Sequence, residues 1–187
     1  MVAAKRADFD AISQKYHIDP VLARIIRNRD VVEDKDIDRF LNGTREHLYA
    51  PGLLKDMDRA VDILLEKIAQ GKRIRIIGDY DIDGICSTYI LFRGLSKCGA
   101  AVDTAIPHRI RDGYGLNENL IQEAYDAGTD TVLTCDNGIA AYEQIAFANS
   151  LGMTVIVTDH HEVPYEEKDG VRQYRVPEAR AVVDPKQ

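Results

Sequence analysis

Residues 73–84 read RIRIIGDYDIDG, and this stretch decides the fold class. Its first part is a short run rich in isoleucine, and three aspartates then occupy alternate positions before Gly84. An apolar run of this length that ends at a glycine predicts a buried strand. Carboxylates that follow a strand often cap the next helix and complement its dipole, so the stretch predicts a strand followed directly by a helix.

The same alternation of strand and helix continues to the end of the chain. Strands are expected at residues 73–79, 100–108, 130–136, 154–160 and 179–185. Helices are expected at residues 57–70, 84–98, 117–127 and 140–151. Short connections in this order require right-handed crossovers and give a mainly parallel sheet. We therefore predict a doubly wound α/β fold with helices on both faces of the sheet.

The N-terminal part has a different pattern. It carries short helical segments such as residues 19–29, where Asp19 precedes Pro20 as a cap precedes the first helical position. We expect a small helical lead-in at residues 1–52 and one main α/β domain at residues 53–187.

Composition narrows the class of protein. With 45% apolar and 29% charged residues, and no apolar run long enough to cross a bilayer, the chain resembles an ordinary cytoplasmic protein without a membrane partner. The three cysteines show no metal-binding spacing and suit reduced thiols. The net charge of −7 argues against broad adhesion to nucleic acid, although carboxylates that hold divalent cations also produce an acidic excess.

Acids and imidazoles follow three of the expected strands. The first strand is followed by Asp79, Asp81 and Asp83, the third by Asp136, and the fourth by Asp159, His160 and His161. In a doubly wound sheet the chemistry lies outside the carboxyl ends of the strands, so these side chains should meet. One such cluster is explained by helix capping, but three at one edge are costly unless they share a cation.

Three kinds of site fit the stretch GDYDIDG (78–84). A calcium loop requires a glutamate at its twelfth position, where this chain has Ile90, and this alternative is rejected. The nucleophile loop of haloacid-dehalogenase-like phosphatases usually has a threonine where Ile85 stands, which leaves that family as a weaker alternative. The third is a two-metal hydrolase. Its ligands are oxygen and imidazole nitrogen atoms, which suit Mn²⁺ or Mg²⁺, from Asp81, Asp83, Asp136 and His160.

Four segments resemble a known family. GDYDIDG (78–84), TCDNGI (134–139) and VTDHH (157–161) match in order and spacing the first three motifs of the DHH phosphoesterases. IPHRIRDGYGLNENLI (106–121) is similar to the signature of the RecJ branch, which consists of exonucleases specific for single-stranded DNA. The N-terminal lead-in is also RecJ-like, so the resemblance covers nearly the whole chain.

The resemblance implies a role for each matching residue. Two ions would be held by Asp81, Asp83, Asp136 and His160, with Asp136 between them. His161 would bind and polarise the scissile phosphate, while Asp79 and Asp159 would orient the ligands. His108 and Arg109 would contact the substrate; Arg109 either grips a phosphate or forms a surface ion pair with Asp112. Tyr114 either stacks on a base or covers its loop.

The implied activity is metal-dependent hydrolysis of phosphodiesters, as a 5′→3′ exonuclease on single-stranded DNA in repair or recombination, with DNA-repair proteins as further partners. The alternatives are a DHH enzyme for short oligonucleotides or cyclic dinucleotides and a non-catalytic RecJ-like binding module. The family carries a fourth motif with another metal-binding aspartate and then a smaller domain. Asp184, in the final VVDPKQ, does not match that aspartate, and we expect these 187 residues alone to have weak activity or none.

Overall fold

The computed structural model describes residues 7–110 and 113–187. The chain divides into two compact units, one that ends at Ala50 and one that begins at Pro51. No helix in the described ranges is both long enough and apolar enough to cross a membrane.

The first unit is helical, as the sequence predicts. Its elements are α1 (Phe9–Tyr16), α2 (Pro20–Asn28), α3 (Asp34–Asn42) and a short 3₁₀ turn, η1 (Arg45–His47). Asp19 caps α2, since its Oδ1 accepts a hydrogen bond of 2.8 Å from the backbone N–H of Val21, and Pro20 opens the helix. The small core of this unit consists of Ala23, Ile26 and Ile37. Local capping and a few apolar contacts thus hold the helices together.

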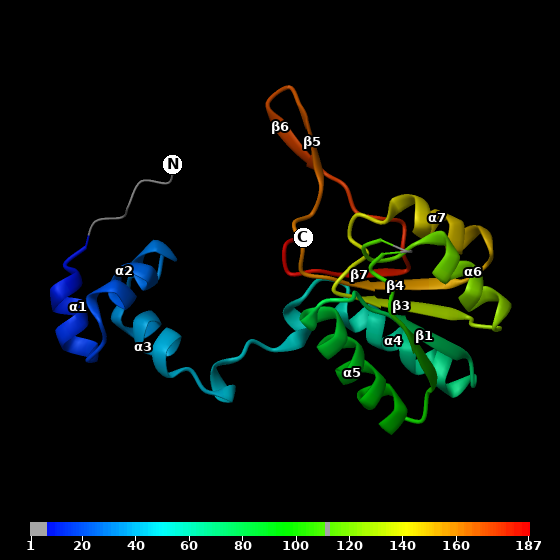
Figure 1. Ribbon diagram of the computed structural model, residues 1–187, viewed down its shortest axis with the longest axis horizontal. Coiled ribbons are helices and arrows are strands. Elements are labelled where there is room, and N and C mark those ends of the chain that lie inside the picture. Colours follow the sequence, from blue (N-terminus) through cyan, green and yellow to red (C-terminus); the bar gives the residue numbers. More distant parts are fainter. Residues whose placement is uncertain (1–6, 111–112) are drawn as a thin grey trace. The chain divides into compact units, whose positions relative to one another are not determined.

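The second unit alternates strands and helices. Its helices are η2 (Pro51–Leu53), α4 (Met57–Ala69), α5 (Ile82–Lys97), α6 (Glu118–Asp126) and α7 (Tyr142–Ser150). Its main strands are β1 (Arg73–Ile77), β2 (Ala101–Ala105), β3 (Thr131–Cys135), β4 (Thr154–Thr158) and β7 (Ala181–Val183). Figure 1 shows the sheet with helices above and below it. Each expected strand and helix of this unit is present, although every strand is shorter than the sequence predicts.

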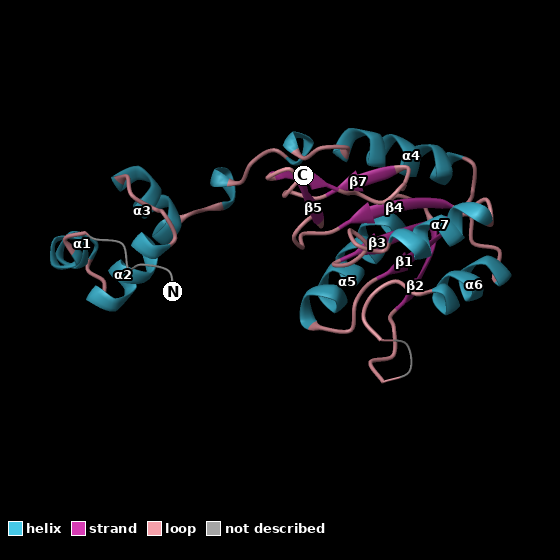
Figure 2. Ribbon diagram, turned by 90° about the horizontal axis from the view of Figure 1, so that it is seen from above, coloured by secondary structure: helices cyan, strands magenta, loops and turns pink. Residues whose placement is uncertain are grey.

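The main sheet is parallel throughout its described strands, in the order β2-β1-β3-β4-β7. This order reverses direction beside β1, because the chain runs from β1 outward to β2 and then returns to β3 on the other side of β1. In open sheets of this kind, ligands bind at the carboxyl ends of the strands near such a switch point. The doubly wound α/β prediction is confirmed (Figure 2).

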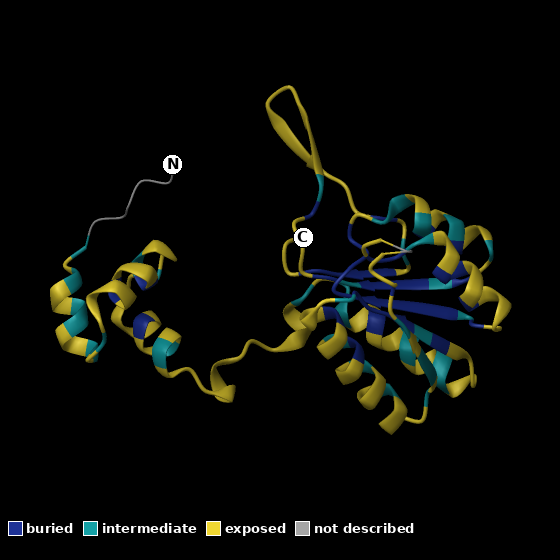
Figure 3. Cartoon of the chain, in the orientation of Figure 1, coloured by how far each residue is buried: buried dark blue, intermediate teal, exposed yellow. Residues whose placement is uncertain are grey.

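Two apolar layers cover the two faces of the sheet. One packs Leu120, Ile121 and Ile145 of α6 and α7 against Val132 and Val155. The opposite layer packs α4 and α5 against the other face, where Ile74, Ile76, Leu133 and Ile156 are buried. Strands β3 and β4 are buried and alternate their side chains between the two layers, and threonine is their only polar residue type. Figure 3 shows β3 and β4 as the buried centre of this unit.

A second, two-stranded sheet follows β4 and was not expected from the sequence. Strands β5 (Tyr165–Lys168) and β6 (Val171–Tyr174) pair in antiparallel fashion and are exposed along their length (Figure 3). Asp169 and Gly170 join them, with φ values of 54° and 75°. Two consecutive left-handed residues make the tight turn that Asp-Gly favours, so this dipeptide is the sequence signal for the hairpin.

Candidate metal centre

The candidate site lies at the carboxyl ends of three neighbouring strands. The sheet order places β1 beside β3 and β3 beside β4, and adjacent strands lie about 4.8 Å apart. Asn137 ties two of these ends together, because its Nδ2 donates to the carbonyl oxygens of Ile77 (3.1 Å) and Cys135 (2.9 Å). The acidic and imidazole clusters predicted at these strand ends therefore meet at one edge of the sheet.

The turn after β1 is shaped by Asp81 and Gly84. Asp81 Oδ1 accepts hydrogen bonds from the backbone N–H groups of Asp83 (2.9 Å) and Gly84 (3.1 Å), and so caps α5. The bond from Gly84 is the main cause that lowers the pKa of Asp81. A Cβ atom at residue 84 would lie 2.5 Å from the backbone nitrogen of Asp79, which is too close for unbonded atoms. Glycine is needed here because α5 begins against the backbone of the preceding turn.

Asp79, Asp81 and Asp136 form a first group of carboxylates. Each offers an oxygen atom, and these atoms lie within 4.8 Å of one another. Asp79 is fully buried, and its Oδ1 accepts a bond of 3.3 Å from the N–H of Gly115. Its Oδ2 has no hydrogen-bond partner among the described residues. A buried carboxylate oxygen without a donor is costly unless a cation compensates it, so this group fits a divalent cation.

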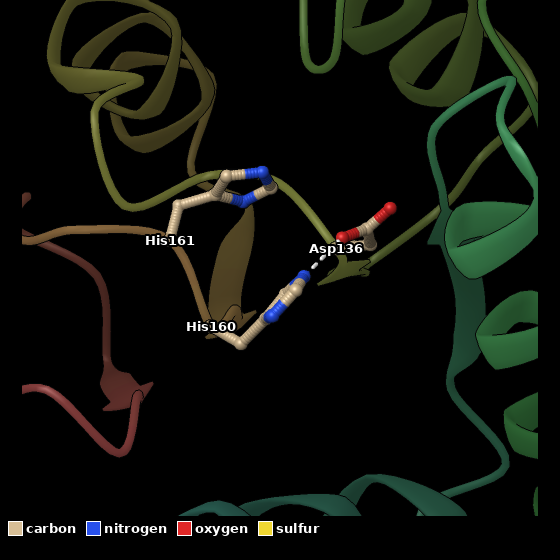
Figure 4. A group of neighbouring side chains, drawn as sticks. All are labelled: Asp136, His160 and His161. Atoms are coloured by element: carbon tan, nitrogen blue, oxygen red, sulfur yellow. Dashed lines mark hydrogen bonds and ion pairs between the residues drawn. The ribbon is translucent and has the colours of Figure 1, made fainter. Parts of the chain in front are cut away.

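Asp136, His160 and His161 form a second group with ligand atoms within the same 4.8 Å (Figure 4). Asp136 has a left-handed backbone (φ 60°), which aspartate tolerates better than most residues. Its Oδ1 lies 2.8 Å from His160 Nε2. Burial is the main cause that raises the pKa of Asp136. Asp136 belongs to both groups, and this shared membership joins the two halves of the site.

Asp159 binds the Nδ1 edge of the His161 ring. Its Oδ1 lies 2.7 Å from His161 Nδ1, and it also accepts the backbone N–H groups of His160 (2.7 Å) and His161 (3.2 Å). Its Oδ2 accepts the N–H of Ile139 at 2.9 Å. An ionised carboxylate can only accept hydrogen bonds, so Nδ1 of His161 carries a proton. In the neutral ring, Nε2 is then an acceptor. The bond to Asp159 is also the main cause that raises the pKa of His161.

Tyr114 completes the surroundings of His161. Its hydroxyl lies 3.1 Å from His161 Nε2 and 3.3 Å from the carbonyl oxygen of Asp136. Burial raises the pKa of Tyr114, so the hydroxyl stays protonated at neutral pH and donates its one proton to the Asp136 carbonyl oxygen or to Nε2. Sequence reasoning assigned Tyr114 only two alternatives, a base contact or a loop cover, because its proximity to His161 arises in the tertiary structure.

The remaining predicted residues lie farther out. Asp83 is exposed on the first turn of α5 and belongs to neither group, although it lines a cavity of about 450 Å³ together with Asp136 and His160. The Arg109 guanidinium lies over the ring of Tyr80, 5.1 Å from its centroid. His108 Nδ1 accepts the backbone N–H of Ile110 at 3.3 Å. The alternative partner of Arg109, residue 112, lies outside the described residues.

Asp184 does not match the family's further metal-binding aspartate in the sequence, yet the structure buries it at the same edge of the sheet. It follows β7, whose Val183 carbonyl accepts the N–H of Asp159 at 3.0 Å. Asp184 is 1% exposed, and its Oδ2 has no hydrogen-bond partner in the described chain. Burial is the main cause that raises its pKa. The signal that marks it is the one used for the other clusters, an acid directly after a short apolar strand.

Comparison with known proteins identifies relatives that are similar in sequence to most of the chain. A Bacillus subtilis protein named single-stranded-DNA-specific exonuclease RecJ is 36% identical over 177 residues, which are 95% of this chain and 21% of that protein. The Thermus thermophilus protein of the same name is 45% identical over 108 residues, or 58% of this chain and 16% of that protein. The chain thus spans about a fifth of the length of these curated relatives.

The similar solved structures are of proteins that carry the same name as these relatives. A crystal structure of exonuclease RecJ bound to manganese is 38% identical and covers 74% of this chain and 33% of its own, with a TM-score of 0.62. The crystal structure of RecJ from Thermus thermophilus in complex with Mn²⁺ is 30% identical and covers 95% of this chain and 23% of its own, with a TM-score of 0.62. The family model for the N-terminal domain of the DHH family matches residues 73–184, more than half of the chain. The chain belongs to the DHH family.

Proposed function

We propose that the chain carries the metal-binding part of an exonuclease that degrades single-stranded DNA from 5′ to 3′. The observation that supports this most is the position of Asp136, whose side chain belongs to both groups of possible ligands. A carboxylate shared in this way would be able to hold two divalent cations, one with each group of ligands. The similar proteins named single-stranded-DNA-specific exonucleases supply the substrate class.

The proposed ligands are Asp81, Asp83, Asp136 and His160, with Mn²⁺ or Mg²⁺ as the ions. Two such ions, when bound, stabilise the charge that develops on the phosphate during in-line displacement. The orphaned oxygen of Asp79 makes this residue a further candidate, in addition to its proposed support of the turn. Asp159 supports the site by holding His161, as its hydrogen bond of 2.7 Å indicates.

The proposed substrate contacts are His161, Arg109 and His108. His161 binds and polarises the scissile phosphate, because its half-exposed ring lies in the group around Asp136, with Nδ1 held by Asp159 and Nε2 beside the Tyr114 hydroxyl. Arg109 grips a second phosphate, since a guanidinium can bind two oxygens at once. His108 lies next to it in the chain and shares this role.

The proposed setting is DNA repair or recombination in the cytoplasm, with single-stranded DNA and DNA-repair proteins as partners. In this proposal residues 1–52 are a helical lead-in and residues 53–187 provide the DHH part of the catalytic domain. Because the chain spans about a fifth of its curated relatives, we expect weak activity or none from the chain alone.

A first experiment tests the metal centre on the chain itself. Titration with Mn²⁺ by isothermal calorimetry should give saturable binding that disappears when Asp136 is replaced by asparagine. Absence of binding to the folded wild-type chain would contradict the proposal.

A second experiment tests the reaction. Residues 1–187 replace the matching segment of the Bacillus subtilis relative, and the chimera, checked for folding by circular dichroism, is given single strands, duplexes and dinucleotides with Mn²⁺. Selective shortening of 5′-phosphorylated single strands from their 5′ ends is expected. Hydrolysis of dinucleotides alone would favour the small-substrate alternative. Mn²⁺ binding without hydrolysis would favour the non-catalytic module.

A further inference from the structure

Two tyrosine rings lie between the proposed phosphate-binding groups. Tyr114 meets His161 edge to face, with ring centroids 6.0 Å apart and planes at 88°. It meets Tyr80 in the same way, at 6.1 Å and 90°. Tyr80 in turn lies under the Arg109 guanidinium, 5.1 Å from it. The contacts therefore run without interruption from His161 to Arg109.

The backbone beside Tyr114 is fixed on its C-terminal side. Gly115 donates its N–H to Asp79 Oδ1 at 3.3 Å, and Asp79 is fully buried at the end of β1. Gly115 has a φ of 68°, and a Cβ atom there would lie 3.2 Å from Cβ of Asn137. A residue other than glycine would be strained in this conformation, so the turn holds the tyrosine in one place.

The bond from Asp159 alone does not fix the plane of the His161 ring. The His161 side chain is 46% exposed, and Asp159 holds only the Nδ1 edge of the ring. The Tyr114 hydroxyl reaches the opposite nitrogen, Nε2, at 3.1 Å. An imidazole that is bonded at both nitrogens has its ring plane fixed, whereas one bond leaves the ring free to tilt.

We propose that Tyr114 is a positioning residue for His161, and that Tyr80 and Tyr114 together set the separation between His161 and Arg109. This inference rests on the proposed function, which assigns phosphate contacts to both of those residues. The Tyr114 hydroxyl fixes the histidine ring, and the two aromatic rings keep the guanidinium at its distance. Their role is to prepare the site for two phosphate contacts at a set spacing.

The first test is spectroscopic and requires no activity. In the full chain labelled with ¹⁵N-histidine, Tyr114→Phe keeps the ring and removes the hydroxyl. It should shift the His161 Nε2 resonance and leave His47 unchanged. Tyr125→Phe, an exposed position on α6, is the matched control and should shift neither resonance. A His161 Nε2 resonance that is unchanged by Tyr114→Phe would overturn the proposal.

The second test measures binding of the 5′-phosphorylated thymidine dinucleotide, which carries two phosphates, in the presence of Mn²⁺. Loss of one hydrogen bond should weaken binding about fivefold in Tyr114→Phe. Tyr114→Leu and Tyr80→Leu, which remove the ring contacts, should weaken it further, while Tyr125→Phe should bind as wild type. Equal binding by all variants would overturn the spacing role. Failure of the proposed function would instead appear as a wild-type chain that binds no Mn²⁺, with the spectroscopic result still intact.

Discussion

Asp136 Oδ1 and His160 Nε2 lie 2.8 Å apart, although the two residues come from the ends of different strands, β3 and β4. The strands pair in register up to Cys135 and Thr158, so the two side chains leave the sheet from neighbouring positions. The spacing of the two residues is thus fixed by backbone pairing. A side chain placed by a sheet loses little further freedom when it binds a ligand.

Replacing Asp136 by asparagine should reduce Mn²⁺ affinity about 100-fold or more, because loss of a supporting partner alone costs about 10–100-fold. Asparagine is the suitable substitution, since it also tolerates the left-handed backbone at this position. Isothermal calorimetry measures the change. Asp130→Asn is the control, because Asp130 lies at the opposite end of β3 and pairs with Lys67 at 2.6 Å. Equal losses in both variants would indicate a general loss of structure.

Two glycines of α5 should respond to alanine in opposite directions. Gly84→Ala should lower the free energy of unfolding by about 1–3 kcal/mol, because the new methyl group would overlap the backbone of Asp79. Gly94→Ala should raise it by about 0.5–1 kcal/mol, since no described atom lies within 4 Å of the new Cβ and alanine favours the helix. Urea unfolding measures both. A stabilising Gly84→Ala would refute the close-approach explanation.

His161 should titrate with a pKa above its ordinary value of 6.5 in the metal-free chain, mainly because of its bond to Asp159. A raised histidine pKa contributes to the free energy of unfolding in full below the unfolded pKa, and this contribution is lost as the pH rises through the folded pKa. Asp159→Asn should lower the pKa of His161. Histidine ring resonances followed by NMR between about pH 5 and 9 test this, with the His17 signal expected not to respond to the substitution.

Asp184→Asn should stabilise the metal-free chain by about 1 kcal/mol at neutral pH. Burial raises the pKa of Asp184, so the free energy of unfolding falls as the pH rises from the ordinary pKa to the folded pKa, and the loss is complete above the folded pKa. The difference between variant and wild type should shrink as the pH approaches the ordinary pKa of 3.8. Urea unfolding in EDTA measures it, and the exposed Asp126→Asn is the control. A destabilised variant would show that the hydrogen bond of 2.8 Å from the Lys186 backbone N–H to Asp184 Oδ1 outweighs the cost of burial.

Much of the fold was predictable because its signals are local. Short apolar strands ended by acids or glycine marked every strand of the main sheet except β2, and the parallel arrangement brought Asp136 and His160 to one edge. The hairpin at residues 165–174 was missed because its strands are polar and lack the apolar pattern that marks the others. Its turn, Asp169-Gly170, was the stronger signal.

The finer geometry of the site could not be predicted. Asp79, Asp81 and Asp83 alternate in the sequence, but the chain turns into α5 between them, so Asp79 is buried while Asp83 faces outward. The bond between Tyr114 and His161 joins residues 47 positions apart. Such contacts depend on how a loop folds back over the sheet, which periodicity does not reveal.

Because of the strand order, metal binding should raise the free energy of unfolding of the chain. The possible ligands follow three separate strands, so the site exists only after the crossovers have closed and the sheet has paired. A cation that binds there binds the folded chain and not the unfolded one, which is worth about 2.7 kcal/mol at a concentration about 100 times its dissociation constant. When manganese or magnesium is scarce, this contribution is lost and the unfolded fraction is expected to rise.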